Sequence, residues 1–231
     1  MLPKSYIVAG CHSWNRAVFE REIRQFDVTW YFLAQKEELT KELLEKISPE
    51  AIFFLHWSWK VPLEILDRYL CICFHMTDLP YGRGGTPLQN LILRGHQSTQ
   101  LSMIKMTEEI DGGSIYYKRE LSLEGSAEEI YERCSDLSAD LIKLFLMEKP
   151  IPLPQEGEVY HFKRRLPHAS EIKEIASLSK LYHQIRMVDA EGYPRAFFNH
   201  EGLRYEFSKA SLNGDVLTAL VKITPAKREE T

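Results

Sequence analysis

The chain has 231 residues, of which 44% are hydrophobic and 27% charged. This length is enough to bury a sizeable core, and it fits one globular catalytic domain with a small appendage. The formal net charge of −4 gives no general attraction to nucleic acid, which favours a small or nucleotide-linked substrate. No signal peptide, long apolar run, disulfide pattern or metal-ligand cluster is visible, so the sequence predicts a cytoplasmic protein without a membrane span and without metal.

The first sixty residues alternate between short apolar strands and helices. Strands are predicted at 6–9, 28–32 and 51–57, with helices at 15–26 and 39–47. This alternation is typical of a parallel sheet, whose ligands bind along the carboxyl ends of the strands. The turn after the first strand therefore places Trp14 and Asn15 near that edge. Trp14 is either a substrate contact or a packing residue.

The segment 71–111 carries the candidate chemistry. An apolar strand ends at His75, a loop rich in proline and glycine follows, and a helix begins near Pro87. A second strand, at 101–106, leads to Asp111, which precedes Gly-Gly. A histidine and an aspartate on two strand-end turns can converge as a base and the group that orients it. The alternative is a satisfied core histidine and an ordinary turn aspartate.

This segment resembles the active-site segment of folate-dependent formyltransferases. The family signature is Asn-x-His, a Leu-Pro turn, an Arg-Gly loop and a Pro-led helix, with a second signature that ends in Asp-x-Gly. The matching positions here are His75, Leu79-Pro80, Arg83-Gly84, Pro87 and Asp111-Gly112-Gly113. The resemblance implies an α/β, Rossmann-like formyltransferase domain with a central, mostly parallel sheet. It also implies 10-formyltetrahydrofolate as co-substrate.

The second half of the chain begins with a capping box, Ser126 with Glu129, which opens a long amphipathic helix. We interpret that helix as scaffold only. Prolines then mark residues 150–157 as a linker, which divides the chain into a catalytic domain (1–149) and a C-terminal subdomain (158–231). In the subdomain the pattern predicts a helix at 170–187, followed by strands at 197–198, 203–207 and 216–223 that form a β-hairpin region.

The C-terminal segment is similar to that of sugar-nucleotide N-formyltransferases. The formylating modules of peptide synthetases resemble only the first half, and tRNA-directed relatives carry a larger C-terminal domain than this tail. The basic triplet 163–165 is either a solvated face or a contact for a diphosphate or carboxylate. The positions that carry the similarity are Tyr160, Arg164, Arg165, Pro167, Ile185-Arg186, Gly192-Tyr193-Pro194, Ala196 and Phe197.

Both resemblances imply roles for individual residues. His75 takes a proton from the attacking amine and helps to stabilise a tetrahedral intermediate, and Asp111 orients or charge-stabilises His75. The predicted cofactor-binding residues are His56, Trp57, Trp59, Arg83, Gly84 and Asp111. The predicted substrate-binding residues are Trp14, Asn15, Thr77, Arg83, Gly85, Arg164, Arg165, Arg186 and Tyr193.

Cys73 departs from the family pattern, because it occupies the position of the asparagine in Asn-x-His. That asparagine supplies a hydrogen bond to the developing oxyanion, whereas a thiol is a weak donor. The donor that takes the place of the asparagine is a backbone N–H, Gln89 or Asn90, or else His75 serves both as the base and as this donor. A nucleophilic Cys73 is the alternative, although formyl transfer to an amine needs no covalent step.

The sequence therefore predicts an N-formyltransferase that acts on a UDP- or dTDP-linked 4-amino-4,6-dideoxy sugar, in surface-glycan biosynthesis. The spelling of residues 75–85 resembles a branch associated with a pseudaminic-acid-type sugar. The predicted partner is a nucleotide-linked amino sugar, with no nucleic acid and no membrane, and the resemblance makes a homodimer plausible. The alternatives are another amine (glycinamide ribotide or aminoacyl-tRNA) and a catalytically weakened folate- or nucleotide-binding protein.

Overall fold

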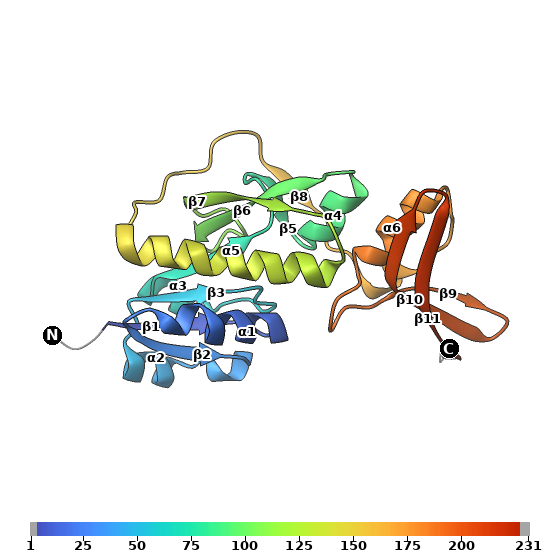
Figure 1. Cartoon of the computed structure of the whole chain (residues 1–231). Helices are drawn as coiled ribbons and strands as arrows, with labels where there is room; N and C mark the ends of the chain where they lie inside the picture. Colours follow the sequence, from blue (N-terminus) through green and yellow to red (C-terminus); the bar gives the residue numbers. More distant parts are fainter. Residues whose placement is uncertain (1–3, 227–231) are drawn as a thin grey trace.

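The computed structural model describes residues 4–226, and its central element is a six-stranded sheet (Figure 1). The strand order is β2-β1-β3-β4-β6-β7, in which the first four strands are parallel and β6 and β7 are antiparallel to their neighbours. The predicted α/β fold with a mostly parallel sheet is confirmed. The strands are β1 (Ser5–Ala9), β2 (Thr29–Leu33), β3 (Ala51–Phe54), β4 (Cys71–His75), β6 (Ser98–Lys105) and β7 (Ile115–Ser122).

Helices cover both faces of this sheet, so its central strands are buried on both sides. Alternate residues of β3 point to opposite faces: Phe53 packs in the core cluster that includes α5, and Phe54 packs in a second cluster that includes α2. This double burial explains the continuous apolar run of that strand. The helices are α1 (Ser13–Arg21), α2 (Lys41–Ile47), α3 (Leu63–Arg68), α4 (Pro87–Leu93) and α5 (Ala127–Glu148).

The long helix α5 begins where the capping box predicts. The Ser126 hydroxyl accepts a hydrogen bond from the backbone N–H of Glu129 at 3.3 Å, and the Glu129 carboxylate accepts one from the backbone N–H of Ser126 at 2.7 Å. The Glu129 carboxylate also accepts from the Ser126 hydroxyl at 2.8 Å. The bond from the Ser126 backbone N–H, and then the bond from its hydroxyl, lower the pKa of Glu129. Within residues 4–226, no helix combines the length and the apolar character that crossing a membrane requires.

The C-terminal part adds two small sheets. Residues 149–159 arch from the end of α5 over β7 (Figure 1), and a short parallel pair follows, formed by β5 (Tyr81–Gly84) and β8 (Tyr160–Phe162). Helix α6 (Leu178–Arg186) then leads to an antiparallel sheet with the order β11-β10-β9. Its strands are β9 (Ala196–His200), β10 (Leu203–Asn213) and β11 (Val216–Pro225).

The helix predicted at 170–187 is wrong in its first half. Residues 167–170 form a short 3-10 turn, and the α-helix begins only after Ser177, whose hydroxyl accepts from the N–H of Lys180 at 3.2 Å. Between them the chain is extended, because the Ile172 N–H donates to the Phe197 carbonyl at 2.6 Å. Pairing with the edge of β9 therefore replaces the first two helical turns, and it leaves Ile175 59% exposed.

The cap of α5 provides a stability test. Ser126→Ala removes the acceptor for the Glu129 N–H, so we expect the free energy of unfolding to fall by about 1 kcal/mol. Urea denaturation monitored by circular dichroism measures this change. The exposed Ser179→Ala in α6 is the control and should shift the free energy by less than about 0.5 kcal/mol. Equal effects of the two substitutions would contradict the capping role.

Candidate active site

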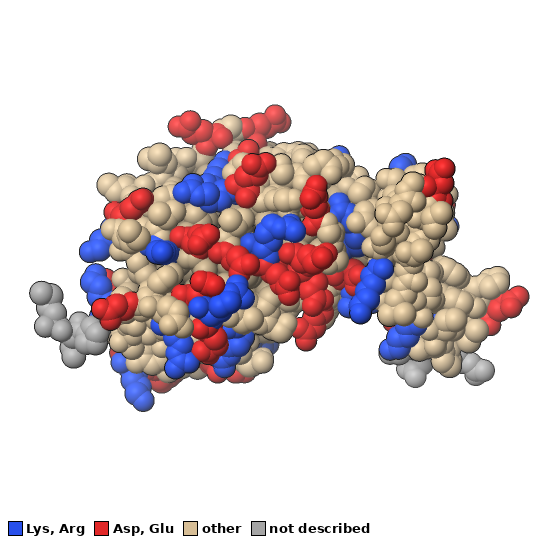
Figure 2. All heavy atoms as spheres, in the orientation of Figure 1, with Lys and Arg blue, Asp and Glu red and all other residues tan. Residues whose placement is uncertain are grey.

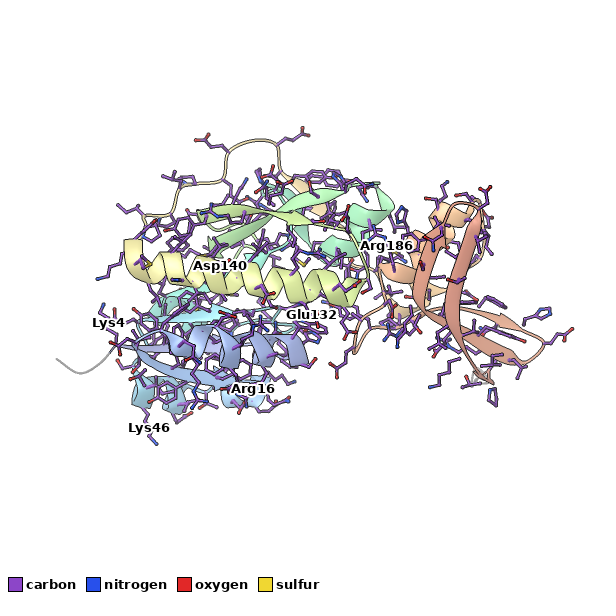
Figure 3. All side chains as sticks on the ribbon, viewed as in Figure 1. Lys4, Arg16, Lys46, Glu132, Asp140 and Arg186 are labelled. Atoms are coloured by element: carbon purple, nitrogen blue, oxygen red, sulfur yellow. The ribbon has the colours of Figure 1, made fainter. Side chains whose placement is uncertain are left out.

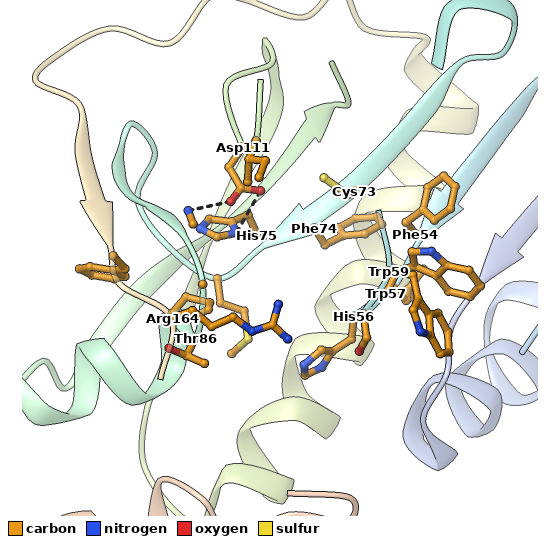
Figure 4. A pocket seen from close by; sticks show the side chains of 18 of the residues that line it. Phe54, His56, Trp57, Trp59, Cys73, Phe74, His75, Thr86, Asp111 and Arg164 are labelled. Carbon is orange, nitrogen blue, oxygen red and sulfur yellow. Dashed lines mark hydrogen bonds and ion pairs between the residues drawn. The ribbon is translucent and has the colours of Figure 1, made fainter. Parts of the chain in front are cut away.

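A cavity of about 980 Å³ opens where β3 and β4 end. Its walls come from these strand ends, from the loop between β6 and β7, from α5, and from residues of the C-terminal half near 162–170 and 192–194. Figure 4 shows His75 and Asp111 on one side of the cavity, with Trp57 and Trp59 toward the other. The cavity therefore lies at the carboxyl edge of the parallel strands, the edge at which the strand pattern predicts ligands to bind.

His75 is fixed in one orientation at the end of β4, where its side chain is 9% exposed. Its Nε2 atom lies 2.8 Å from the Gly82 carbonyl oxygen. A carbonyl can only accept, so Nε2 carries the hydrogen. Nδ1 then holds the lone pair of the neutral ring, and it lies 3.4 Å from Oδ1 of Asp111. The structure therefore assigns the basic nitrogen of this histidine to Nδ1.

Asp111 reaches His75 from an unexpected direction. Strand β6 is antiparallel to β4, so its last residue, Lys105, pairs with Ile72 near the start of β4. The loop that follows returns toward the end of β4 and adopts a left-handed backbone at Asp111, with φ of 54°. Oδ2 of Asp111 accepts a hydrogen bond from the Gly84 N–H at 2.9 Å. The two predicted residues thus converge, through a returning loop rather than a shared sheet edge.

Two predicted binding residues of the 77–85 loop are buried away from the cavity wall. Arg83 is 6% exposed, and it pairs with Glu109 at 2.5 Å and with the Gln155 carbonyl oxygen at 2.8 Å. Thr77 is fully buried. Gly84 and Gly85 do line the cavity, and a Cβ atom on Gly85 would lie 2.7 Å from the side chain of Arg164.

Aromatic rings form the far side of the cavity. Trp57 and Trp59 meet edge to face with ring centroids 4.8 Å apart. The His56 Nε2 atom lies 2.8 Å from the Tyr193 hydroxyl, and burial together with the neighbouring His12 lowers the pKa of His56 to about 3. His56 is therefore neutral near pH 7. All four of these predicted residues line the cavity.

The two predicted residues of the first turn differ in position. Trp14 is 4% exposed, stacks between His12 (4.4 Å) and Tyr131 (5.5 Å), and does not line the cavity, so it is a packing residue. Asn15 does line the cavity although it is fully buried, and its amide nitrogen donates to the Ser135 hydroxyl at 3.2 Å.

The three predicted substrate-binding arginines differ in position. Arg164 projects into the cavity (Figure 4), and Arg165 lines it while it donates to the Ala169 carbonyl. Arg186 lies elsewhere, at the junction of α6 with the start of α5 (Figure 3). It is 4% exposed and donates to the carbonyls of Leu123 at 2.6 Å and Gly125 at 2.8 Å. These contacts make Arg186 a structural clamp between the two halves.

Cys73 lines the cavity near His75, but its surroundings do not activate the thiol. Burial, and then the charges of Asp111 and Cys71, raise the pKa of Cys73. Neither side-chain amide offered as a replacement donor is free. Gln89 donates to the Tyr131 hydroxyl at 3.1 Å and to the Met187 carbonyl at 2.9 Å, and Asn90 donates to the Thr86 and Lys163 carbonyls.

The interpretation of α5 as scaffold only is wrong. Tyr131, Ser135 and Ser138 lie at i, i+4 and i+7 on its inward face and line the cavity. This polar stripe inside an apolar face was the available signal. His12 and Gln155 were also missed, and no local pattern marks either of them. Within residues 4–226, no group of three or more acidic, histidine or cysteine side chains is arranged to hold a metal.

Comparison with known proteins places this site in a family. The profile described as "Methionyl-tRNA formyltransferase, C-terminal domain" matches residues 167–224. A solved structure named methionyl-tRNA formyltransferase, from Clostridium thermocellum, is 44% identical, has a TM-score of 0.94, and is matched over 96% of this chain and 100% of that chain. This chain belongs to the formyltransferase family. Members of the family use 10-formyltetrahydrofolate as the formyl donor.

More distant relatives complete the comparison. A curated methionyl-tRNA formyltransferase from Rickettsia felis is 27% identical over 172 residues, which are 71% of this chain and 56% of that protein. The chain thus spans about half the length of such curated relatives. A 4-N formyltransferase structure from Francisella tularensis is 18% identical, with a TM-score of 0.65 over 86% of this chain and 93% of that one, which shows a shared fold.

The predicted nucleotide-sugar acceptor and the surface-glycan role are wrong, and so is the exclusion of nucleic acid. The tail that resembles sugar N-formyltransferases matches the methionyl-tRNA formyltransferase profile instead. The relatives named for methionyl-tRNA differ in length, because the Clostridium structure is matched over its whole length whereas the Rickettsia felis protein is matched over 56%. A net charge averaged over the chain says little about a local nucleic-acid contact.

The partly buried His56 predicts a pH dependence of stability. In the unfolded chain a histidine titrates near 6.5, whereas His56 in the fold titrates at about 3. Below pH 6.5 the unfolded state therefore binds a proton that the folded state does not, so stability falls as the pH falls, by up to about 1.4 kcal/mol per pH unit. His56→Asn, which tolerates the positive φ of this position, should flatten the fall between pH 6.5 and 4 in urea unfolding. An unchanged slope would contradict this assignment.

Proposed function

We propose that this protein transfers a formyl group from 10-formyltetrahydrofolate to the amine of methionyl-tRNA. The observation that carries the proposal is the 44% identity to the Clostridium methionyl-tRNA formyltransferase, over 96% of this chain and 100% of that one. The profile match at 167–224 also supports it, and that segment contributes Pro167, Ser170 and Tyr193 to the cavity lining.

The tryptophan side of the cavity fits a flat, partly polar ring such as the pterin of the folate. Trp57 and Trp59 offer apolar faces, and the buried Trp57 Nε1 atom has no hydrogen-bond partner in the fold. Residues 105–109 also line the cavity. Bound there, the folate would supply the formyl carbon. The opposite side, near Arg164, would receive the amino acid.

His75 is the base in this proposal. The attacking amine must be neutral, and Nδ1 of His75 is the ring nitrogen free to accept its proton. The Gly82 carbonyl holds the ring in place through Nε2, at 2.8 Å. The Asp111 carboxylate, 3.4 Å from Nδ1, stabilises the imidazolium that results. Gln89 and Asn90 are engaged elsewhere. Both N–H groups of a protonated His75 face Gly82 and Asp111, so the donor to the formyl oxygen in this proposal is a backbone N–H.

The basic side chains near the cavity suit the phosphates of the acceptor. Arg164 and Arg165 line the cavity beside Pro167, and guanidinium groups bind phosphate well. The outer face of α1 and α5 is unsuitable by contrast. Acidic side chains are prominent there (Figure 2), and Glu132 and Asp140 point outward along α5 (Figure 3). We therefore infer that the tRNA end approaches along the 163–167 segment.

The function is tested by incubating the purified protein with 10-formyltetrahydrofolate and initiator methionyl-tRNA. We expect formylmethionyl-tRNA by mass spectrometry of the released amino acid. His75→Ala should lower kcat at least about a hundredfold, the usual contribution of a general base. Glycinamide ribotide and a UDP-linked amino sugar serve as comparison acceptors. Formylation of either one, with none of methionyl-tRNA, would overturn the proposal.

Cys73→Ser separates the two interpretations of the cysteine. The raised pKa of Cys73 disfavours the thiolate, so Cys73 is not expected to act as a nucleophile. A residue that only lines the cavity tolerates a small change, and we expect kcat within about threefold of wild type. A nucleophilic cysteine would instead lose essentially all activity on substitution by serine. Cys134→Ser, at a second cysteine that lines the same cavity, is the matched control.

A further inference from the structure

Gln155, in the segment that follows α5, has every polar atom of its side chain engaged around the candidate site. Its amide nitrogen donates to the carbonyls of Asp111 at 2.7 Å and Gly113 at 2.8 Å. Its carbonyl oxygen accepts from Arg83 Nε at 3.0 Å and Nη2 at 2.8 Å. Four such bonds fill the capacity of a glutamine side chain, two donors and two lone pairs.

The segment that carries Gln155 is itself held on both sides. Leu153 exchanges two backbone bonds with Ile115 at the start of β7, at 2.7 and 2.9 Å. On the other side, the Tyr160 N–H donates to the Pro80 carbonyl at 3.3 Å. The arch in Figure 1 is thus tied to the sheet at one end and to the His75 loop at the other. Gln155 lies between the two ties.

Gln155 donates hydrogen bonds to the backbone of the loop that carries Asp111. Asp111 has a φ of 54°, a conformation that costs free energy for a residue with a Cβ atom and persists only where its surroundings impose it. Beside it, a Cβ atom on Gly113 would lie 1.7 Å from the Lys105 carbonyl, so the loop is tightly packed there. The two carbonyls on either side of Gly112 both point at Gln155.

We propose that Gln155 is a positioning residue, which holds the Asp111 backbone so that its carboxylate faces His75. Only the kinetic test of this role rests on the proposed function. The position of the Asp111 carboxylate can be tested without it. Gln155 does not line the cavity, so it acts through Asp111 and not by touching substrate. Arg83 has a supporting part, since it orients the Gln155 amide and binds Glu109 on the same loop.

Gln155→Glu separates this role from simple anchoring of the segment. A carboxylate keeps the length and still accepts from Arg83, but it cannot donate to the Asp111 and Gly113 carbonyls, and the partial negative charge of their oxygens repels it. If Gln155 only anchored the segment to Arg83, Gln155→Glu would be as active as wild type, whereas Gln155→Ala would not. The positioning role predicts that both variants are impaired. Gln25→Glu, at an exposed glutamine whose amide donates to the Glu20 carbonyl at 3.2 Å, is the matched control.

In steady-state kinetics with methionyl-tRNA, we expect Gln155→Glu to lower kcat about ten- to a hundredfold, the usual effect of a misplaced catalytic group. The KM for 10-formyltetrahydrofolate should stay within about twofold, because no cavity contact is lost. In an Asp111→Asn background the same substitution should add less than about threefold, since two residues that act as a unit are not additive. A full additional loss in that background would overturn the proposal.

A second measurement does not depend on activity. The Gly84 N–H donates to Asp111 Oδ2, so its hydrogen exchange, followed by NMR, reports whether the carboxylate stays in place. We expect exchange at least about tenfold faster in Gln155→Glu and unchanged in Gln25→Glu, because a broken hydrogen bond exposes the amide to solvent. Unchanged exchange at Gly84 would overturn the positioning role. A wild-type protein that does not formylate methionyl-tRNA would refute only the proposed function, and the exchange test would still decide the role of Gln155.

Discussion

The hydrogen bond between His75 Nε2 and the Gly82 carbonyl is the constraint on which the rest of the site depends. It forces the 76–85 loop to fold back beneath the ring, a turn that Gly82 accommodates with a φ of 78°. It also fixes which nitrogen is basic. Once Nδ1 is the free nitrogen, a stabilising carboxylate is useful only on that side, and Asp111 is the group that the β6–β7 loop brings there.

The apolar pattern predicted the sheet well, because its central strands are buried on both faces. The start of α5 was predicted as well, because the capping box at Ser126 is a local signal. The pairing of His75 with Asp111 could also be anticipated, although not the antiparallel β6 that makes the loop return. Strand direction is set by long-range pairing, which a single sequence does not encode locally. The same reason explains the late start of α6, since a contact of Ile172 with β9 overrides an acceptable helical pattern.

Residue type alone misled the assignment of roles. Arg83 and Arg186 were expected to contact a ligand, yet both are buried. Arg83 donates to Gln155 and Glu109, and Arg186 donates to backbone carbonyls. Conversely, Tyr131 and Ser135 were set aside with the scaffold because they belong to a strongly amphipathic helix. The acceptor was mispredicted for a related reason. The motifs around His75 encode formyl transfer, which every member of the family shares, and say little about the amine that receives the group.

The returning loop that carries Asp111 separates the parts of this chain that can vary in length from those that cannot. Residues 106–114 must span from the end of β6 back to His75 and then enter β7, whose register with β6 is fixed. Inserting or deleting a single residue there would turn the carboxylate away from the imidazole. The length of residues 171–177, between the 3-10 turn and α6, does not fix the position of any group next to His75. Past its pairing with β9 at Glu171 and Ile172, that connection can therefore change in length while the proton-transfer machinery stays the same.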